Sequence, residues 1–521
     1  MDALTRFARS ARFPLLAFVT LLLPWSAAAQ PVLVVDSTSV SAQTNEGTSA
    51  PSQTVLVSNT GNQPLKWSVA LQETPAGPLT AGWLSVSPMT GTNNRAITLT
   101  FQPQPAGQYQ TKFQIVPATG SSSPVTVTVN LTVNGGTDLA PPPPSGVGPQ
   151  STITCPEGAV DILPGQYIQG FVNLSPGATT FCLRAGVHSL TSAITPKTGN
   201  TFVGEYGAVL DGADWTTDDD TQAAFRAYNE DIDYVTVRNL VIRNMPQWGI
   251  HAFYQMADHW TIEYNEIAYN RWGLLFGQEF TIGNNYIHHN VGNSSSSIPA
   301  ERGGGYLGDF ADNATFDSNE IAYNGSEQKV GRSANVTFRN NFVHHNVRDG
   351  IWYDSNPNAG ALIEGNRVED NGRNGIFFEA SIGATIRNNT VQRSAFDAVF
   401  ISMSQNAQIY NNTLDGNYGG IDYFLDCSVL SSVDDVQNNA AYDNTVVVGP
   451  QSDAYASAFS TRSCTPGQLT PYLNGSKNLT FSRNAYRVPS LSFTRYFFWS
   501  GWNDWNQWQA VPQDGGGSIS Q

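Results

Sequence analysis

An asparagine recurs at similar spacings through the middle of this chain, and this repeat constrains the fold more than any other feature. Each copy ends a short segment of Thr and β-branched or aromatic residues; the copies are Asn265, Asn285, Asn319, Asn341, Asn366, Asn389 and Asn412. The successive spacings are 20, 34, 22, 25, 23 and 23 residues. Repeats of this length are typical of solenoids, whose units bury their apolar faces only by stacking on one another.

Each repeat consists of a few short strands separated by Asn and Gly, and no helical periodicity is visible. This combination predicts an all-β fold, a right-handed parallel β-helix. In this interpretation the Asn column is structural, because Asn tolerates the left-handed backbone of a bend and its amide can bond to the next coil.

One strand of each coil carries the candidate site. Residues 350–354, 375–379 and 398–402 occupy equivalent positions, and strand alternation sends Ile351, Tyr353, Ile376, Phe378, Val399 and Ile401 to the interior. Counting to the same strand position in the two preceding coils predicts one outward column, which consists of Asp309, Lys329, Asp354, Glu379 and Ser402. The neighbouring outward column is then Leu307, Glu327, Trp352, Phe377 and Phe400.

Stacked like charges about 5 Å apart are unfavourable unless a cation or a function compensates. A solvated face neutralised by Lys329 is one interpretation. Yet only 13% of the residues are charged, and acids beside aromatic rings are typical of a groove that cleaves sugars. We therefore predict Asp354, Glu379, Lys329 and Asp309 as catalytic. The predicted substrate-binding residues are Trp352, Phe377, Phe400, Glu327 and His251.

The chain divides into four predicted parts. Residues 1–29 combine three arginines, a short apolar run and a small-residue end, which predicts a secretory signal peptide. Residues 31–135 have the short alternating strands of a β-sandwich. Residues 136–150 contain four successive prolines and predict a semi-rigid linker. The solenoid then occupies residues 151–521.

Composition sets limits on location and partners. No other apolar run is long enough to cross a membrane, so we expect the protein to be secreted. We also expect a monomer. In an oxidising compartment the four cysteines pair most simply as Cys155–Cys182 and Cys427–Cys464, although three connectivities are possible. The net charge of −16 argues against a nucleic-acid partner.

Two segments resemble known families. Residues 57–67 and 83–88 resemble the BACON-type immunoglobulin-like module, which accompanies secreted glycan-processing proteins. Residues 343–354 and 374–379 are similar to a group of right-handed β-helix repeat proteins of the pectate-lyase-like superfamily. That resemblance places the group's Asp, Glu and Lys at Asp354, Glu379 and Lys329, and it implies a polysaccharide partner. Residues 326–329 depart from the Gly-rich segment that usually holds this Lys.

Three functions remain open from the sequence. Glycoside hydrolysis requires two carboxyl groups beside the scissile bond, needs no cofactor here, and is the function we favour. In the lyases of this fold, clustered acids bind Ca²⁺ and a basic residue removes a proton. Asp309, Asp354 and Glu379 would then hold the ion, with Lys329 as the base. A protein that only binds carbohydrate, or an adhesin, is the third possibility.

Overall fold

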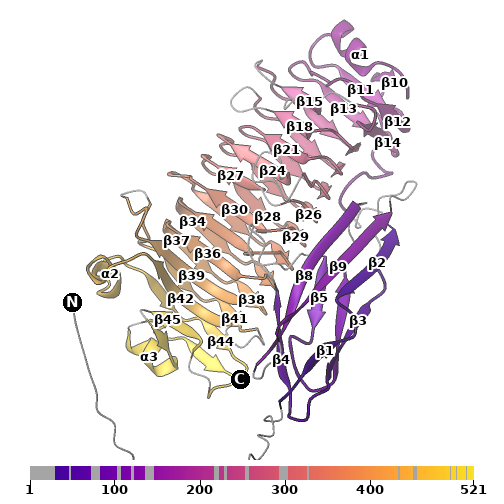
Figure 1. Ribbon diagram of the computed structural model, residues 1–521. Coiled ribbons are helices and arrows are strands. Elements are labelled where there is room, and N and C mark those ends of the chain that lie inside the picture. The colour runs from indigo at the N-terminus through magenta and orange to yellow at the C-terminus, as the bar shows by residue number, and fades with distance from the viewer. Residues whose placement is uncertain are drawn as a thin grey trace, which may run out of the picture.

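The protein is a stack of β-strand coils, and the β-sandwich that precedes it in the sequence lies beside the stack (Figure 1). The computed structural model describes residues 30–45, 49–71, 83–102, 107–118, 123–134, 146–215, 222–227, 231–252, 257–292, 303–325, 328–431, 434–449, 454–492, 495–499, 501–511 and 513–521. The predicted signal peptide and the prolines of the predicted linker lie outside these residues.

The N-terminal domain consists of two sheets. The first has the order β1 (Leu33–Val35), β3 (Gln53–Asn59), β7 (Arg95–Phe101), β5 (Leu84–Ser87). The second has the order β2 (Ser39–Asn45), β9 (Val125–Asn134), β8 (Gly107–Pro117), β4 (Lys66–Leu71), β6 (Thr90–Thr92). Alternate residues of most of these strands meet in one apolar core, and Trp67 and Trp83 belong to it with 2% and 7% of their surface exposed. These two rings are therefore core residues.

The β-helix has three long sheets in which strands of successive coils pair in parallel, and most coils contribute one strand to each sheet. Within the described residues the first sheet has 13 strands: β10 (Val160–Ile162), β11 (Thr180–Leu183), β13 (Thr201–Gly204), β16 (Thr236–Arg238), β19 (Thr261–Glu263), β22 (Thr281–Gly283), β25 (Thr315–Asp317), β28 (Thr337–Arg339), β31 (Ala361–Glu364), β34 (Ile382–Arg387), β37 (Gln405–Tyr410), β40 (Ala440–Tyr442) and β43 (Thr480–Ser482).

The second sheet also has 13 strands in the described part of the chain. They are β12 (Gly186–Ser189), β14 (Ala208–Asp211), β17 (Val241–Arg243), β20 (Glu266–Ala268), β23 (Tyr286–His288), β26 (Glu320–Ala322), β29 (Phe342–His344), β32 (Arg367–Glu369), β35 (Thr390–Gln392), β38 (Thr413–Asp415), β41 (Thr445–Val447), β44 (Ala485–Arg487) and β47 (Ser518–Ser520).

The third sheet carries the candidate site, and the described residues give it 12 strands. They are β15 (Ala223–Ala227), β18 (Trp248–Ala252), β21 (Trp272–Phe276), β24 (Gly304–Asp309), β27 (Lys329–Gly331), β30 (Ile351–Asp354), β33 (Ile376–Glu379), β36 (Asp397–Ser402), β39 (Gly419–Asp426), β42 (Tyr455–Arg462), β45 (Phe497–Trp499) and β46 (Trp502–Asn503). The predicted all-β fold, a right-handed parallel β-helix after a small β-sandwich, is confirmed.

The interior of the stack is apolar. Side chains from all three sheets form one continuous buried cluster. The six residues predicted to point inward are Ile351, Tyr353, Ile376, Phe378, Val399 and Ile401, and each has 0% of its surface exposed. Strand alternation therefore assigns the two faces of the third sheet correctly. The residues that alternate with these six along each strand point outward.

Both ends of the stack are covered. Helix α1 (Ile168–Leu174) buries Ile168 and Val172 against the first coils. Helices α2 (Pro466–Leu473) and α3 (Trp505–Ala510) lie at the C-terminal end, where Trp508 is fully buried. Capping matters in a solenoid because terminal coils lack a neighbour on one side. The predicted disulfides are both present, one toward each end: Cys155–Cys182 with Cα atoms 5.6 Å apart and Cys427–Cys464 at 4.9 Å.

The repeated asparagines form a buried hydrogen-bonded ladder. Asn341 is representative: its Nδ2 donates to the carbonyl of Phe316 and to Oδ1 of Asn366, while its Oδ1 accepts from the main-chain N–H and Nδ2 of Asn319. The predicted amide contacts between coils are therefore confirmed. A second ladder, which the sequence analysis missed, runs through Asn270, Asn290, Asn324, Asn346 and Asn371.

The ladder asparagines do not themselves adopt the left-handed backbone that we predicted for them. The residue before each has the positive φ instead, for example 56° at Tyr264 and 58° at Ser318. Two adjacent residues of the turn therefore have different roles. One residue makes the bend, and the next points its amide inward to satisfy the backbone groups that the bend leaves unpaired.

Candidate functional site

The third sheet aligns the predicted acids, with one correction. Asp354 pairs in register with Glu379, and Glu379 pairs with Ser402. However, Leu307 pairs with Lys329, and both Asp309 and Asp354 pair with Gly331. The predicted register of β27 is therefore wrong by two residues. Gly331, not Lys329, occupies the column of the acids, and Lys329 precedes Trp352 in the aromatic column.

Lys329 nevertheless reaches the site from its new position. Its Nζ donates to Oδ2 of Asp354 at 2.7 Å and lies 4.8 Å from the ring centroid of Trp352. The Lys329 and Asp354 side chains are 30% and 22% exposed, so the ion pair is partly accessible to solvent. The structure thus brings the predicted lysine and this predicted carboxylate into direct contact.

Asp309 lies apart from the other two acids. Gly331 separates it from Asp354 along the column, and Arg332 binds both of its carboxylate oxygens in a bidentate ion pair. Glu327, predicted to bind substrate, lies outside the described residues. The carboxyl groups that the coils place on adjacent strands are therefore those of Asp354 and Glu379.

The aromatic column is a stack of rings. Trp352 and Phe377 have centroids 5.6 Å apart and planes 11° apart, and Phe377 and Phe400 are 5.2 Å apart. Only 7% of Trp352 and 2% of Phe377 are exposed, so these rings pack on each other and do not present their faces to a sugar. One structural role is visible: Nε1–H of Trp352 donates to Oε2 of Glu379 at 3.1 Å.

Glu379 has a raised pKa, which is a property that a general acid needs. Burial, and next the charge of Asp354, raise its pKa from 4.5 to about 7, although the hydrogen bond from Trp352 and the charge of Arg373 act in the opposite direction. The carboxyl of Glu379 is therefore largely protonated in mildly acidic solution. Asp354, by contrast, accepts a hydrogen bond from an ammonium group. The two neighbouring carboxyls thus have different environments, as an acid and a carboxylate partner require.

Two arginines on the same face were not anticipated. Arg348 and Arg373 come from successive coils, and the main-chain N–H of Arg373 donates to the carbonyl of Arg348. The Cζ atom of Arg348 lies 5.6 Å from the Trp352 ring and that of Arg373 lies 5.4 Å from the Phe377 ring. Each precedes its ring by four residues. This spacing in the turns before the strands was a signal that the sequence analysis left unused.

A second group of acids lies further along the sheet. The hydroxyl of Tyr455 donates to Oδ1 of Asp397, and Asp422 accepts from the hydroxyl and main-chain N–H of Ser460. Burial, followed by the charge of Asp422, raises the pKa of Asp397 well above its usual value. Burial raises the pKa of Asp422 to about 6. Sequence reasoning missed this group because it focused on the column of Glu379.

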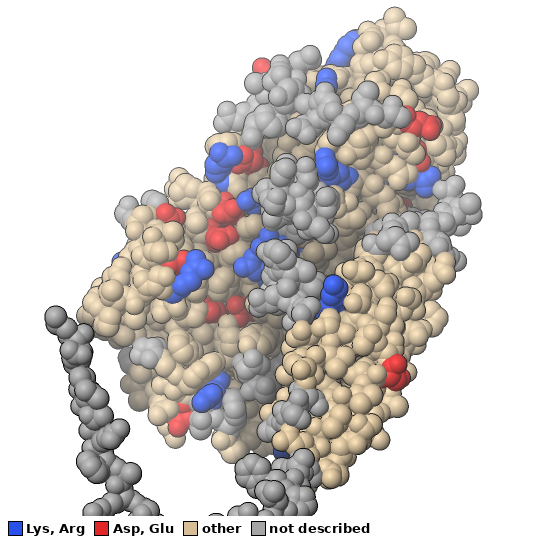
Figure 2. All heavy atoms as spheres, in the orientation of Figure 1, with Lys and Arg blue, Asp and Glu red and all other residues tan. Residues whose placement is uncertain are grey.

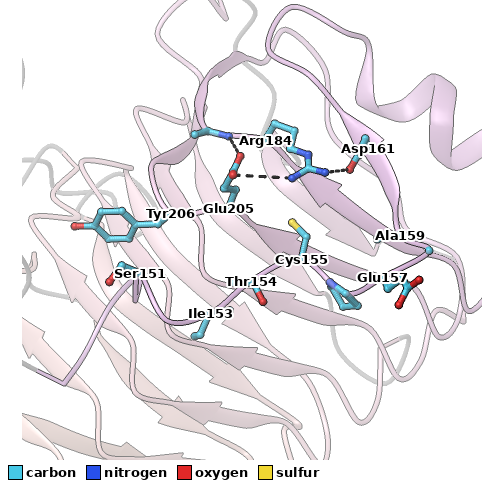
Figure 3. Close-up of a pocket in the computed structure, with 13 residues that line it drawn as sticks. Ser151, Ile153, Thr154, Cys155, Glu157, Ala159, Asp161, Arg184, Glu205 and Tyr206 are labelled. Atoms are coloured by element: carbon cyan, nitrogen blue, oxygen red, sulfur yellow. Dashed lines mark hydrogen bonds and ion pairs between the residues drawn. The ribbon is translucent and has the colours of Figure 1, made fainter.

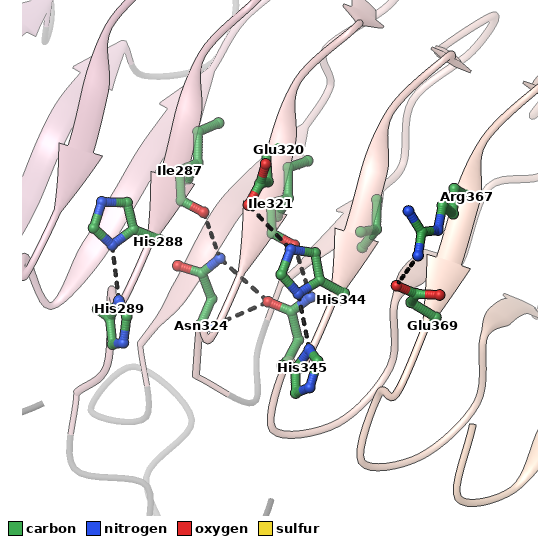
Figure 4. Close-up of polar contacts among 12 residues, drawn as sticks. Ile287, His288, His289, Glu320, Ile321, Asn324, His344, His345, Arg367 and Glu369 are labelled. Atoms are coloured by element: carbon green, nitrogen blue, oxygen red, sulfur yellow. Dashed lines mark hydrogen bonds and ion pairs between the residues drawn. The ribbon is translucent and has the colours of Figure 1, made fainter. Parts of the chain in front are cut away.

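The histidines predicted or considered from the sequence lie apart from Asp354 and Glu379. His251, predicted to bind substrate, is 4% exposed on β18 and packs against Trp248, several coils before Asp354. The pairs His288–His289 and His344–His345 lie at the second sheet (Figure 4). In each pair the two Nδ1 atoms are 2.8 Å apart.

Neither a metal centre nor a membrane span is visible in the described part of the chain. No group of three or more His, Cys, Asp or Glu side chains there is arranged to hold a metal ion. No helix among the same residues has the length and apolar character needed to cross a bilayer.

A hollow of about 610 Å³ lies at the N-terminal end of the β-helix, and Figure 3 shows the residues that line it. Arg184 in its wall pairs with Asp161 at 2.7 Å, and none of the predicted catalytic or substrate-binding residues lines it.

Fold and site together define a parallel β-helix with a charged face, preceded by a β-sandwich. The sequence profile described as right-handed β-helix region matches residues 223–360, 296–446 and 352–485, which together cover more than half of the chain. The protein therefore belongs to the right-handed β-helix family. The profile of the viral BACON domain matches residues 32–134. No curated protein sequence matches the chain.

Several solved structures are similar to the chain at low identity. The catalytic unit of the family GH87 α-1,3-glucanase from Streptomyces thermodiastaticus is 11% identical, over 90% of this chain and 89% of that one, with a TM-score of 0.40. The family 28 exopolygalacturonase of Yersinia enterocolitica is 12% identical, over 88% and 92%, with a TM-score of 0.37. The Dettilon tailspike protein is 12% identical, over 66% and 62%, with a TM-score of 0.38. Likenesses of this size do not assign a reaction to this chain.

Proposed function

We propose that the protein is a secreted enzyme that hydrolyses glycosidic bonds of an extracellular polysaccharide, with Glu379 as the acid and Asp354 as the carboxylate. One observation carries the proposal. Two carboxyl groups lie on adjacent strands of one face, one with its pKa raised to about 7 and the other bound by an ammonium group. A glycosidase needs such a pair, one protonated and one ionised.

We propose a retaining course, with which a pair on adjacent strands is compatible. Adjacent strands of a sheet are about 4.8 Å apart, and carboxyls about 5–5.5 Å apart serve a retaining mechanism. Asp354 would attack the anomeric carbon while Glu379 gives its proton to the departing glycosidic oxygen. Water would then cleave the glycosyl–Asp354 bond, and Glu379 would recover a proton from that water. Lys329, whose Nζ contacts Oδ2 of Asp354 at 2.7 Å, would orient that carboxylate for the attack and stabilise it again when water releases it from the sugar.

Elimination is the second candidate, and the contacts favour it less. In that reaction Lys329 would have to accept a proton, but its Nζ donates to Asp354 at 2.7 Å. Asp309 would have to join Asp354 and Glu379 around Ca²⁺, yet Arg332 occupies both of its oxygens. A role in binding alone would leave the raised pKa of Glu379 without a use.

Secretion is part of the proposal. Its support is the two disulfide bonds, which form and persist in oxidising compartments, together with the sequence of residues 1–29.

The test is digestion of a polysaccharide panel by the wild type, Glu379→Gln and the matched control Glu364→Gln, each with and without a chelator. Glu364 is a suitable control because it lies on β31 of the first sheet, in an ion pair with Arg387. Reducing ends and the absorbance of unsaturated products are followed together. We expect new reducing ends without unsaturation, unaffected by the chelator, in the wild type and Glu364→Gln only.

Other results would decide against the proposal in different ways. Unsaturated products that disappear with the chelator would establish a metal-dependent lyase. Equal cleavage by wild type and Glu379→Gln would remove Glu379 from the reaction. Cleavage by none of the three proteins, with binding retained, would indicate a carbohydrate-binding protein.

A further inference from the structure

The hollow at the N-terminal end of the β-helix is a second candidate site, separate from the acid pair on the third sheet. Its volume of about 610 Å³ is typical of sites that bind small molecules. Arg184 and Glu205 in its wall come from the turns that follow β11 and β13 of the first sheet. Five steps between coils separate β13 from β28, which belongs to the coil of Asp354, and five steps correspond to about 24 Å along the stack.

The walls of the hollow are held in place by the fold. One wall is the segment of residues 151–159, which the disulfide Cys155–Cys182 anchors to β11. The carboxylate of Glu205 in the opposite wall is fixed as well, because its Oε2 accepts a hydrogen bond from the main-chain N–H of Ala185 at 3.0 Å. A site built in advance in this way has little ordering cost when a ligand binds.

Arg184 and Glu205 leave a gap that one hydroxyl group would fill. Nη1 of Arg184 lies 3.9 Å from Oε1 of Glu205, too far for a direct hydrogen bond. No hydrogen bond within the described residues engages either atom, whereas Nη2 of Arg184 pairs with Asp161 at 2.7 Å. An oxygen between the two atoms has to accept from the guanidinium group and donate to the carboxylate. A hydroxyl does both, whereas a carboxylate or sulfate only accepts and an ammonium group only donates. A ligand hydroxyl would therefore replace water here.

Tyr206 adds an apolar surface beside this polar gap. It is the residue after Glu205 and is 56% exposed. Figure 3 shows Glu205 between Tyr206 and Arg184. A tyrosine ring presents an apolar face with a polar tip. The C–H face of a pyranose would pack on that ring, and the hydroxyl groups at the edge of the sugar would then reach Glu205 and Arg184.

The charges of the hollow favour an uncharged ligand. Glu157, Asp161 and Glu205 line it together with one cation, Arg184, so three carboxylates and one guanidinium group leave a net charge of −2, which repels a polyanion. Charged side chains of both signs lie over the visible face of the β-helix (Figure 2). Attraction by charge alone would thus not confine a ligand to the hollow, whereas the gap beside an exposed ring is a specific arrangement.

We propose that this hollow binds a neutral glycan, with one hydroxyl bridging Arg184 and Glu205 and one sugar ring packed on Tyr206. Its role is attachment of the polymer, about 24 Å along the stack from the acid pair and on a different sheet. A second attachment point raises the effective concentration of the polymer at the first. The inference is independent of the reaction proposed for Glu379, because none of the residues that carry it belongs to that site.

The test measures binding by the full-length protein in the Glu379→Gln background, so that the proposed cleavage does not consume the probe. Tyr206→Ala removes the ring, and Ala185→Gln fills the hollow without deleting a side-chain contact. The control Tyr167→Ala removes a ring that is 64% exposed at the N-cap of α1, outside the hollow, and that makes no capping hydrogen bond. Affinity electrophoresis in dextran, laminarin, galactomannan and hydroxyethylcellulose, at low salt and in about 0.5 M sodium chloride, gives the dissociation constants.

We expect at least one of these neutral polymers to retard the background protein to a similar extent at both salt concentrations, because the recognised groups carry no charge. Tyr206→Ala and Ala185→Gln should each raise the dissociation constant for that polymer by about fivefold or more, which is the size of one lost ring contact. Tyr167→Ala should stay within about twofold. Near-ultraviolet circular dichroism confirms that each variant is folded.

Three results would overturn the inference: no retardation by any neutral polymer, equal dissociation constants for Tyr206→Ala and Tyr167→Ala, or retardation that salt abolishes, which would indicate ionic attraction. These failures are separate from failure of the proposed hydrolysis. Cleavage by the wild type of a polymer that Tyr206→Ala binds as tightly as the background protein does would refute the second site alone. Retardation that Tyr206→Ala loses, in a protein whose wild type cleaves no polymer, would refute hydrolysis alone.

Discussion

Replacing Glu379 by glutamine should change how stability depends on pH. The pKa of this carboxyl is 4.5 when unperturbed and about 7 in the folded protein. Between these values the folded protein retains the proton that the unfolded chain has lost. The contribution of Glu379 to stability is therefore complete at low pH and disappears as the pH rises toward 7. A rise of this size corresponds to roughly 3 kcal/mol.

Glutamine keeps the shape and cannot ionise, and it can still accept the hydrogen bond from Trp352. The free energy of unfolding is measured by urea denaturation for wild type and Glu379→Gln at about pH 4 and about pH 8. Groups that do not interact with Glu379 contribute equally to both proteins, so the difference isolates this residue together with its interaction with Asp354. We expect the stability of the variant relative to wild type to increase by roughly 3 kcal/mol over this range.

Asp317→Asn provides a control of opposite sign. Burial raises the pKa of Asp317, but hydrogen bonds from Ser318, Asn340 and Arg339 outweigh it and lower the pKa. Its contribution to stability is present at neutral pH and is lost as the pH falls through that lowered value. The variant should be less stable than wild type at neutral pH and approach it in acid. A difference for Glu379→Gln that does not vary with pH would refute the assignment of the buried proton.

Three further perturbations test other parts of the structure. Trp352→Phe removes a hydrogen bond that lowers the pKa of Glu379, so the alkaline limb of the pH–rate profile should move to higher pH. Asn341→Ala deletes four buried hydrogen bonds and should lower the free energy of unfolding in urea by about 3 kcal/mol. Its control, Asn340→Gly, lies at an exposed left-handed position with φ 56° and should lower that free energy by less than about 1 kcal/mol. Asp309→Asn should retain cleavage within about threefold of wild type, since Asp309 lies apart from the acid pair; a loss like that of Glu379→Gln would return it to the site.

The sequence predicts the architecture well because the repeat is a physical requirement of the stack. Alternation identifies the interior residues, since each strand has one buried and one outward face. The register of β27, in contrast, cannot be predicted from alternation. A shift of two residues leaves every side chain on the same face, so alternation does not distinguish Lys329 from Gly331 in the column of the acids.

The remaining site residues depend on side-chain reach, which the pattern of a strand does not reveal. Arg348 and Arg373 lie in turns and fold back over rings four residues later. Tyr455 and Asp397 are 58 residues apart in sequence and meet only because the coils stack. Glu379 could be placed from the sequence, but its raised pKa depends on its burial in the folded protein.

The contact between Tyr455 and Asp397 has a consequence for how this chain can change in length. Asparagine ladders join each coil only to its immediate neighbours, so a whole coil can be duplicated or lost without breaking their pattern. Tyr455, however, pairs in register with Gly419, and Gly419 pairs with Asp397. A Cβ atom at Gly419 would lie 2.8 Å from the Tyr455 hydroxyl oxygen. The phenol of Tyr455 on β42 thus reaches across the coil of β39 to Asp397 on β36. This contact fixes the number of coils between β36 and β42 at one.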